Sequence, residues 1–371
     1  MRRTVLVVML AGCYAPRPPA GAHCADGVCP SGLVCSPATQ TCELTATDPA
    51  DAALDTPPVL PSSFRYRRRI SIHNAASAPL PTGFTIRVPL PSVLALLASQ
   101  GKVNPDLSDL RVIGDDAIGE RDRIIDPVLG PAPAALSFSL QAPIAAGATS
   151  TGYALYYGNP AATVPPANGA AVFPIYDDFT NGISALWLRN DAPISNNGKL
   201  VLRAGHTDAL ATNATTDPLP VISAIELVAS VADPTSEPTT QPTGTFYYWF
   251  GYQHINDFIA SDPWVVWISR DKNQIRAEQK SPVGCEAGTC NGTPATPNTA
   301  PHAYAIERDP TATRFYVDGA LSYTAMITGQ VDYAVMVRNF MATSDLSVDW
   351  IRARARVSPD PTITVAAEET M

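Results

Sequence analysis

The stretch TRFYVDGALSY, residues 313–323, gives the strongest local signal for the fold of this chain. The dipeptide Asp318-Gly319 stands between two runs rich in aromatic and β-branched residues, a pattern typical of a β-hairpin closed by a tight turn. Similar runs recur on both sides, as GTFYYWFGYQHI at 244–255 and SVDWIRARARV at 347–357, and no long helical pattern separates them. The second half of the chain is therefore predicted to be an antiparallel sandwich or jelly roll.

The region that begins at Phe64 alternates with period two, which predicts half-buried strands. One face of its first strand carries Phe64, Tyr66, Ile70 and Ile72, and the other carries Arg65, Arg67 and Arg69. We interpret the arginine row as a solvated outer face, with an anion-binding patch as the alternative. Further short strands follow, separated by Gly, Pro and Asp, so this region is predicted to be a sandwich too. The predicted fold class is all-β, with two antiparallel β-sandwiches after a small disulfide-rich N-terminal segment.

Composition narrows the function classes. Lys+Arg 25 against Asp+Glu 34 gives a net charge of −9, which argues against a nucleic-acid partner because such binding rests on neutralising phosphates. The 36 prolines argue against an all-helical protein. The 371 residues suffice for two domains.

The N-terminus reads as an export signal. Arg2 and Arg3 precede an apolar run over 4–12 that is too short to span a bilayer. The run ends LAGC at 10–13 and resembles the lipobox of bacterial lipoproteins, in which the signal (here 1–12) is removed and the cysteine (here Cys13) is acylated. The alternative is an ordinary signal peptide with a chance cysteine. The resemblance implies membrane attachment through palmitate-type lipid, at the outer membrane or cell surface of a high-GC Gram-negative bacterium.

Cysteine parity supports that interpretation. Seven cysteines are present, and setting Cys13 aside leaves two internally even groups, which suits disulfides in an exported protein. The candidates are Cys24, Cys29, Cys35 and Cys42 in residues 13–42, and Cys285 with Cys290 further on. Three pairings of the first four remain open. Residues 43–63, rich in Ala, Asp, Pro and Thr, read as a spacer.

Residues 64–160 resemble the bacterial domain-of-unknown-function 2341 family. The resemblance rests on the opening strand FRYRRRISI at 64–72, LSDLR at 107–111, and the closing YYGNP at 156–160. It implies architecture and a setting in exported surface proteins, but no activity. Phe64 stands where this family usually has Trp. Residues 161–171 are predicted to link this domain to the next.

Residues 172–366 resemble the concanavalin-A-like lectin/glucanase superfamily. The order of elements carries the resemblance: YDDF at 176–179, GKLVL at 198–202, FGYQ at 250–253 and YAIERDPTATRFYVDGALSY at 304–323. The superfamily implies a jelly roll and includes both lectins and hydrolases. Its glucanases carry Glu-x-Asp-x-(x)-Glu on one strand; that motif is absent here, and Glu226, Glu278 and Glu307 are isolated in the sequence.

The sequence therefore favours a non-catalytic surface protein that binds carbohydrate or a protein partner, with a hydrolase or a purely structural envelope protein as alternatives. Candidate ligand-binding residues are Tyr248, Phe250, Tyr252, Trp267, Asn256 and Arg270, although sandwich cores also use aromatic side chains. No catalytic residue is predicted. The candidate ligands for a structural calcium ion are Asp177 and Asp178, with a solvated acidic pair as the alternative.

Overall fold

The computed structural model describes residues 24, 33–35, 42–44, 63–114, 119–126, 135–212, 219–220, 222–232, 248–253, 264–271, 274–280, 299–326 and 334–371. It divides into an N-terminal unit, residues 1–60, and a larger unit, residues 61–371. None of the helices formed by the described residues has the length and apolarity needed to cross a membrane.

The N-terminal unit holds one short antiparallel ribbon. Strand β1 (Leu33–Cys35) pairs with β2 (Cys42–Leu44), and Cys35 faces Cys42. Cys35 is bonded to Cys24, with a Cα–Cα distance of 5.9 Å. This disulfide confirms that the segment is crosslinked.

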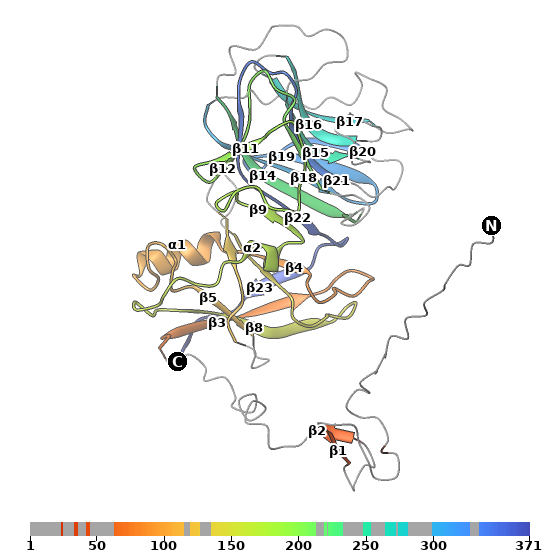
Figure 1. Cartoon of the computed structure of the whole chain (residues 1–371). Coiled ribbons are helices and arrows are strands. Elements are labelled where there is room, and N and C mark those ends of the chain that lie inside the picture. The colour runs from red at the N-terminus through yellow and green to blue at the C-terminus, as the bar shows by residue number, and fades with distance from the viewer. Residues whose placement is uncertain are drawn as a thin grey trace, which may run out of the picture. The chain divides into compact units, whose positions relative to one another are not determined.

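The first sandwich has two layers, seen in the lower part of Figure 1. One sheet joins β3 (Tyr66–His73), β5 (Arg111–Gly114) and β8 (Thr149–Tyr157), and the other joins β4 (Thr85–Pro89), β6 (Ile124–Ile125) and β7 (Ala135–Ser139). Helix α1 (Pro91–Ser99) adds Leu97 to the apolar core between them. Ile70 and Ile72 are fully buried there, as alternation predicts.

The end of the chain returns to this first sandwich. Strand β23 (Thr362–Val365) and strand β24 (Glu369–Thr370) both pair with β3. Residues 172–366 were predicted to form the second sandwich, so the position of β23 corrects that boundary. The physical reason is that β3 pairs with β8 along one edge and would leave its other edge unpaired. Strand β23 pairs with that edge, with Ile363 opposite Ile72.

The end of the predicted linker, residues 161–171, contacts the first sandwich. Helix α2 (Gly169–Val172) is capped by Asn168, whose side chain accepts from the amide of Ala170. The Thr85 hydroxyl donates to the carbonyl of Val172, and the Asn168 amide donates to Asp122. The segment is therefore held against the first sandwich by hydrogen bonds.

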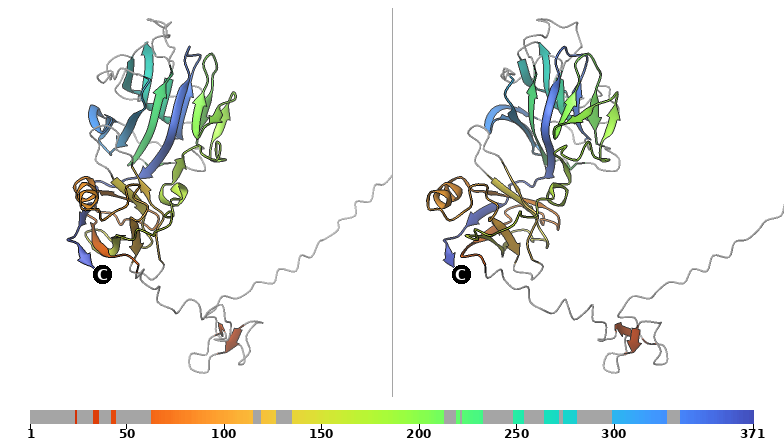
Figure 2. Two further views of the ribbon diagram at one scale, coloured as in Figure 1. Left: turned by 90° about the vertical axis from the view of Figure 1, so that its left-hand side faces the viewer. Right: turned by 60° about the vertical axis from the view of Figure 1, so that its left-hand side comes forward.

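The second sandwich packs a six-stranded sheet on an eight-stranded one (Figures 1 and 2). The six-stranded sheet has the order β10-β13-β21-β15-β16-β17, made of β10 (Leu188–Asn190), β13 (Ala209–Ala211), β21 (Ala334–Asn339), β15 (Tyr248–Gln253), β16 (Trp264–Asp271) and β17 (Gln274–Lys280). The eight-stranded sheet has the order β11-β12-β22-β14-β18-β19-β20, with β9 beside β22; its strands are β9 (Ile175–Asp177), β11 (Ile194–Asn196), β12 (Lys199–Leu202), β14 (Ser223–Val231), β18 (His302–Arg308), β19 (Ala312–Val317), β20 (Ala320–Met326) and β22 (Leu346–Ala355). Among the described residues every strand pairing is antiparallel, which confirms the predicted fold class.

The predicted hairpin forms as expected. Strands β19 and β20 pair through Val317 and Ala320, and the turn residues Asp318 and Gly319 both have positive φ, 49° and 79°. Two consecutive left-handed residues match the twist of the flanking strands, which is why an Asp-Gly turn suits this position.

Candidate functional site

The aromatic residues predicted to bind ligand lie in the core of the second sandwich. Tyr248, Phe250, Tyr252 and Trp267 are at most 1% exposed and belong to the apolar cluster between the two sheets. The ring of Trp267 meets those of Tyr304 and Phe315 edge-on, at centroid distances of 5.5 and 5.4 Å. Their interpretation as a sugar-stacking platform is therefore corrected: packing against the opposite sheet leaves no ring face for a ligand.

The other face of the six-stranded sheet carries a second set of side chains in register. Three rows cross the strands: Arg338–Trp249–Ile268–Arg276 and Met336–Gly251–Val266–Glu278 over β21, β15, β16 and β17, then Ala334–Gln253–Trp264 over β21, β15 and β16. We call this set the outward aromatic face. The rings of Trp249 and Trp264 meet at 4.9 Å with an interplanar angle of 63°. Two indoles flanked by amide, guanidinium and carboxylate groups form the candidate ligand-binding surface of this sandwich.

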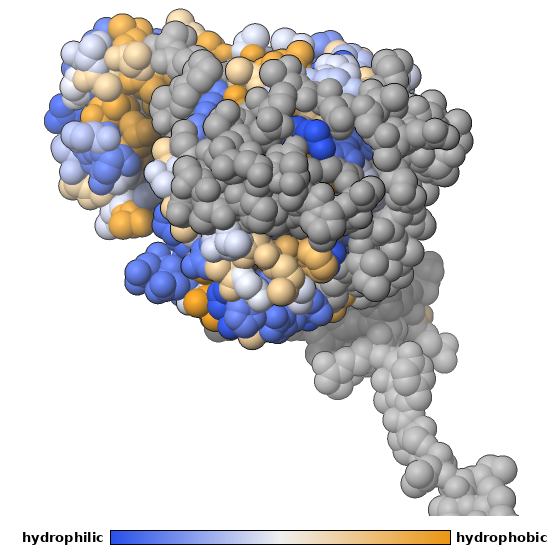
Figure 3. Space-filling view, turned by 90° about the horizontal axis from the view of Figure 1, so that it is seen from above, coloured by the Kyte–Doolittle hydropathy of each residue, from blue (hydrophilic) through white to orange (hydrophobic). Residues whose placement is uncertain are grey.

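Both indoles on the outward aromatic face are buried, and they pack with Val266, Ile268 and Met336 into a small apolar cluster. The face is thus a filled surface rather than an open groove. Over the described surface seen from above, hydrophobic and hydrophilic residues are interspersed (Figure 3).

Sequence alternation already separates these two sets on β15, because Trp249 and Tyr248 must point to opposite faces. Alternation does not say which face meets the other sheet. Trp249 and Trp264 were therefore not among the predicted ligand-binding residues.

Acidic residues are sparse on the outward aromatic face. On β15 the outward positions are Trp249, Gly251 and Gln253. Gly251 has φ +148°, and a Cβ there would lie 2.4 Å from the carbonyl oxygen of Val265, so this backbone admits no larger residue. Among the described residues of this face, Glu278 is the only carboxylate, and its Oε2 lies 3.7 Å from Nε of Arg276.

The outer face of the eight-stranded sheet has a contrasting, ionic character, and we call it the outward ionic face. Arg352 on β22 donates from Nε to Oε2 of Glu226 on β14, at 2.8 Å, and pairs through Nη1 with Asp126 of the first sandwich, at 2.6 Å. Asp126 also accepts from Arg87, at 2.8 Å. The Arg352 guanidinium lies over the rings of Phe173 and Trp350. This ion cluster joins the two sandwiches.

Electrostatics in this cluster hold Glu226 in its charged form. Burial alone raises the pKa of Glu226, but the guanidinium groups of Arg352, Arg87 and Arg354 outweigh it, so the pKa lies well below its usual range. The pKa of Arg352 is raised, because the attraction of Glu226 and Asp126 exceeds the opposing effect of burial. A catalytic acid needs the opposite shift, towards neutral pH.

Asp177 and Asp178, predicted to hold calcium, act as hydrogen-bond acceptors for the chain around them. Asp177 accepts from the amides of Phe179 and Ser184 and, at 2.8 Å, from Nε1 of Trp187. Asp178 accepts from the amide of Thr180. The two acids point to different partners, and Asp177 has its oxygens committed to N–H donors.

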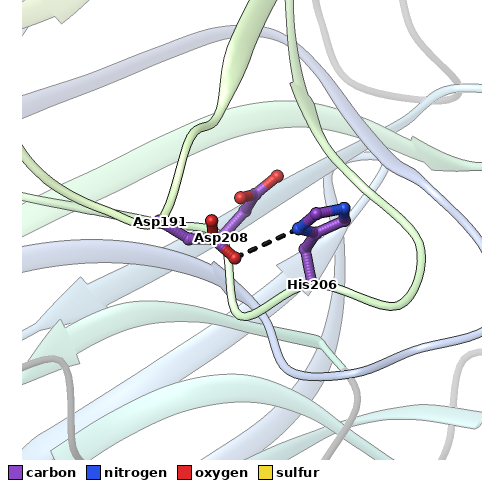
Figure 4. A group of neighbouring side chains, drawn as sticks. All are labelled: Asp191, His206 and Asp208. Atoms are coloured by element: carbon purple, nitrogen blue, oxygen red, sulfur yellow. Dashed lines mark hydrogen bonds and ion pairs between the residues drawn. The ribbon is translucent and has the colours of Figure 1, made fainter.

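A different group brings together three ligand atoms of metal-binding type. One ligand atom each of Asp191, His206 and Asp208 lies within 4.8 Å of the others, a spacing compatible with a structural ion (Figure 4). Arg203 supplies a cation to the same group: its Nε and Nη2 donate to Asp208 at 2.8 and 2.9 Å. Burial opposes ionisation of Asp208, but the hydrogen bonds from Arg203 and from two backbone amides lower its pKa.

Five residues predicted to be functional or crosslinked lie outside the described residues: Cys13, Cys29, Asn256, Cys285 and Cys290. Arg270 lies on β16 and Cys42 on β2, of which only the backbone is described here.

Comparisons with known proteins find likeness of fold only. No protein-family model matches this chain, and no curated protein does. Among solved structures, the laminarinase catalytic domain of Thermotoga maritima is 12% identical, with 50% of this chain and 98% of that chain covered and a TM-score of 0.39. The endo-β-1,3-glucanase of Pyrococcus furiosus is 10% identical, with 50% and 94% covered and a TM-score of 0.39. The carbohydrate recognition domain of Emp47p is 7% identical, with 49% and 95% covered and a TM-score of 0.35.

Proposed function

We propose that this chain is an exported, lipid-anchored protein of a bacterial cell envelope whose second sandwich binds a polysaccharide, without catalysis, through the outward aromatic face. The observation that carries the binding proposal is the register that gathers Trp249 and Trp264 beside Gln253, Glu278 and Arg338, all of them at most 7% exposed. The proposal therefore requires that the two indoles become accessible when a polysaccharide binds, so that they stack on the apolar faces of sugar rings.

The non-catalytic part of the proposal rests on where the glutamates lie. Glycoside hydrolysis uses two carboxylates across one bond, about 5–10 Å apart. Glu226 belongs to the outward ionic face, in contact with Arg352, and Glu278 belongs to the opposite sheet. Glu307 accepts from the hydroxyl of Tyr316 and pairs with Arg354, again on the ionic face. Glu226 and Glu307 thus share the ionic face, but each is paired with arginines there, Glu226 with Arg352 and Glu307 with Arg354, while Glu278 lies on the other sheet.

The anchor and the location are proposed from the sequence. LAGC at 10–13 resembles a lipobox, and the remaining six cysteines have even parity. The resemblance of residues 64–160 to the domain-of-unknown-function 2341 family favours a location on the cell surface. Another surface protein is therefore a second class of binding partner. Labelling with radioactive palmitate tests the anchor: label lost in Cys13→Ser supports it, and unchanged label refutes it.

Binding is tested with the full chain on a polysaccharide panel. We expect saturable binding to one glycan class, lost in Trp249→Ala and in Trp264→Ala but retained in the core variant Trp267→Phe, with folding checked by circular dichroism. Gln253→Ala is a milder variant on the same face. Absence of binding to every polysaccharide would refute the proposal and leave a structural envelope role.

A second candidate, a glycan hydrolase, draws on one observation: Glu278 shares a face with the two tryptophans. Release of reducing ends from a bound polysaccharide, abolished in Glu278→Gln, would favour it over the binding protein. Retained binding in Glu278→Gln with no release by the wild type would favour the first proposal.

A structural calcium ion is not included in this proposal. Asp177 is committed to N–H donors, and Arg203 balances the charge of Asp208 and Asp191. Addition of EDTA is therefore expected to leave the Tm unchanged; a fall in Tm reversed by calcium would show that an ion is held.

A further inference from the structure

The first sandwich contains a polar cavity of about 310 Å³ at the end of its larger sheet. Three segments quoted in the sequence analysis meet there: Arg65 and Tyr66 at the start of β3, Asp109 before β5, and Gly158 with Pro160 after β8. Residues 100–104, which follow helix α1, complete the wall. The volume is at the lower end of the range of small-molecule sites, roughly 300–1,000 Å³.

The cavity is held together by a buried carboxylate. Asp109 is 1% exposed, and it accepts from the amide of Asn104 at 2.8 Å and from the amide of Gly158 at 3.0 Å. It therefore ties the loop after α1 to the turn after β8. Gly158 has φ +83°, and a Cβ there would lie 2.7 Å from the Tyr66 ring, so the turn approaches the ring as only glycine permits.

The aromatic and ammonium groups of the wall are fixed by partners. Tyr66 stacks on Tyr157 at 5.6 Å, and Nζ of Lys102 lies 4.6 Å from the centre of the Tyr66 ring. Glu368 accepts from Lys102 and, at 2.8 Å, from the hydroxyl of Tyr157. The charge of Lys102 is therefore balanced within the protein.

Arg65 differs from Lys102 in this respect. Its side chain is exposed, and among the described residues no carboxylate or other acceptor pairs with its guanidinium, whereas its neighbours Arg67 and Arg69 both pair with Glu369. The Gln100 side chain on the same wall likewise has no hydrogen-bond partner among those residues. The lining of the cavity thus includes a planar bidentate cation and the Gln100 amide, together with the Asn104 amide, whose Nδ2 donates one hydrogen bond to the Ser108 hydroxyl at 3.0 Å.

We propose that this cavity binds the carboxylate-bearing sugar unit of an acidic polysaccharide. A guanidinium pairs with a carboxylate through two parallel hydrogen bonds, and the amides of Gln100 and Asn104 match neighbouring hydroxyls, as donors and acceptors at once. This site lies in the first sandwich and is separate from the outward aromatic face, so either proposal can fail while the other stands.

The test is calorimetric titration of the full chain with galacturonate, with a short oligogalacturonate, and with galactose and acetate as references. We expect galacturonate to bind at least about tenfold more tightly than either reference, because a charge-assisted hydrogen bond and the hydroxyl contacts each contribute. Binding should weaken as salt is raised, since Arg65 is exposed.

Two charge-matched variants locate the site. Arg65→Gln is expected to weaken galacturonate binding by about tenfold or more, whereas Arg189→Gln, which removes an exposed arginine of the second sandwich, leaves it unchanged. Gln100→Ala, at an exposed position, gives a second measure that does not threaten folding. Trp249→Ala should leave this binding intact.

The proposal is overturned by any of three results: no saturable binding of either uronate, equal affinities for galacturonate and galactose, or equal losses in Arg65→Gln and Arg189→Gln. Equal affinities for acetate and galacturonate would overturn the assignment of a sugar.

Discussion

The two outward faces of the second sandwich are built from the same alternating strands and yet carry opposite chemistry. On the outward ionic face, Glu226 pairs with Arg352 and Arg354, and Arg352 also pairs with Asp126 of the first sandwich, which in turn pairs with Arg87. The outward aromatic face places Trp249 and Trp264 in an apolar cluster with one weak ion pair. The comparison teaches that polar alternation alone does not mark a solvent face: here one such face joins the sandwiches, and the other is the candidate binding surface.

Removing the central cation of the ionic face should give the largest effect. Arg352→Leu leaves Glu226 and Asp126 as buried charges without their guanidinium, and we expect a loss of about 3–5 kcal/mol in the free energy of unfolding. Urea denaturation measures it. An exposed arginine changed in the same way, Arg189→Leu, is the control. A loss below about 1 kcal/mol would mean that the pairs are solvated.

Truncation on the aromatic face should cost less. Trp249→Ala removes one buried indole from a small cluster, and we expect a loss of about 3 kcal/mol, at the lower end of the range for buried Trp→Ala changes. The matched variant Trp249→Phe should recover most of that loss. The truncation removes no charged group, so the loss in unfolding free energy should be the same at low and high salt. A strong salt dependence would show that electrostatic interactions stabilise this face as they do the ionic face.

The ionic face should also make stability depend on pH. The pKa of Glu226 is lowered in the folded state, so its contribution is fully present above the ordinary glutamate pKa of about 4.3 and is lost as pH falls below that value towards the folded pKa. Glu226→Gln should therefore flatten the decline in unfolding free energy on the acid side. Glu369→Gln, at a half-buried carboxylate whose pKa is lowered by the hydrogen bond from Arg67, should flatten it less, because solvent screens that pair. Equal slopes in Glu226→Gln and the wild type would contradict the pKa shift.

The smallest effect is expected at the ion pair of the aromatic face. Arg276 and Glu278 lie 3.7 Å apart and Arg276 keeps 20% of its side chain exposed, so Arg276→Gln should change stability by less than about 0.5 kcal/mol. Thermal unfolding checks this. A loss comparable to that of Arg352→Leu would show that this face holds an ion network of the same kind.

Much of the local structure could be predicted. Alternation placed Tyr248, Phe250 and Tyr252 together on one side of β15, and Asp318-Gly319 marked the β19–β20 turn. Local patterns have this power because strand periodicity and positive-φ turns depend on a few neighbouring residues. The prediction that this side binds a ligand was wrong, because it packs against Tyr304 and Phe315, which lie on strands distant in the sequence.

The all-β class, the hairpin and the crosslinked N-terminal segment could be predicted from the residues alone, because they follow from strand periodicity, turn chemistry and cysteine parity. Three features appear only in the folded chain: β23 completes the first sandwich, Arg352 bridges Glu226 and Asp126, and Asp109 draws Asn104 and Gly158 around one cavity. Each of these joins residues that are near in space and apart in the chain. Such pairings are selected by burial and charge balance over the whole fold, and no local pattern encodes them.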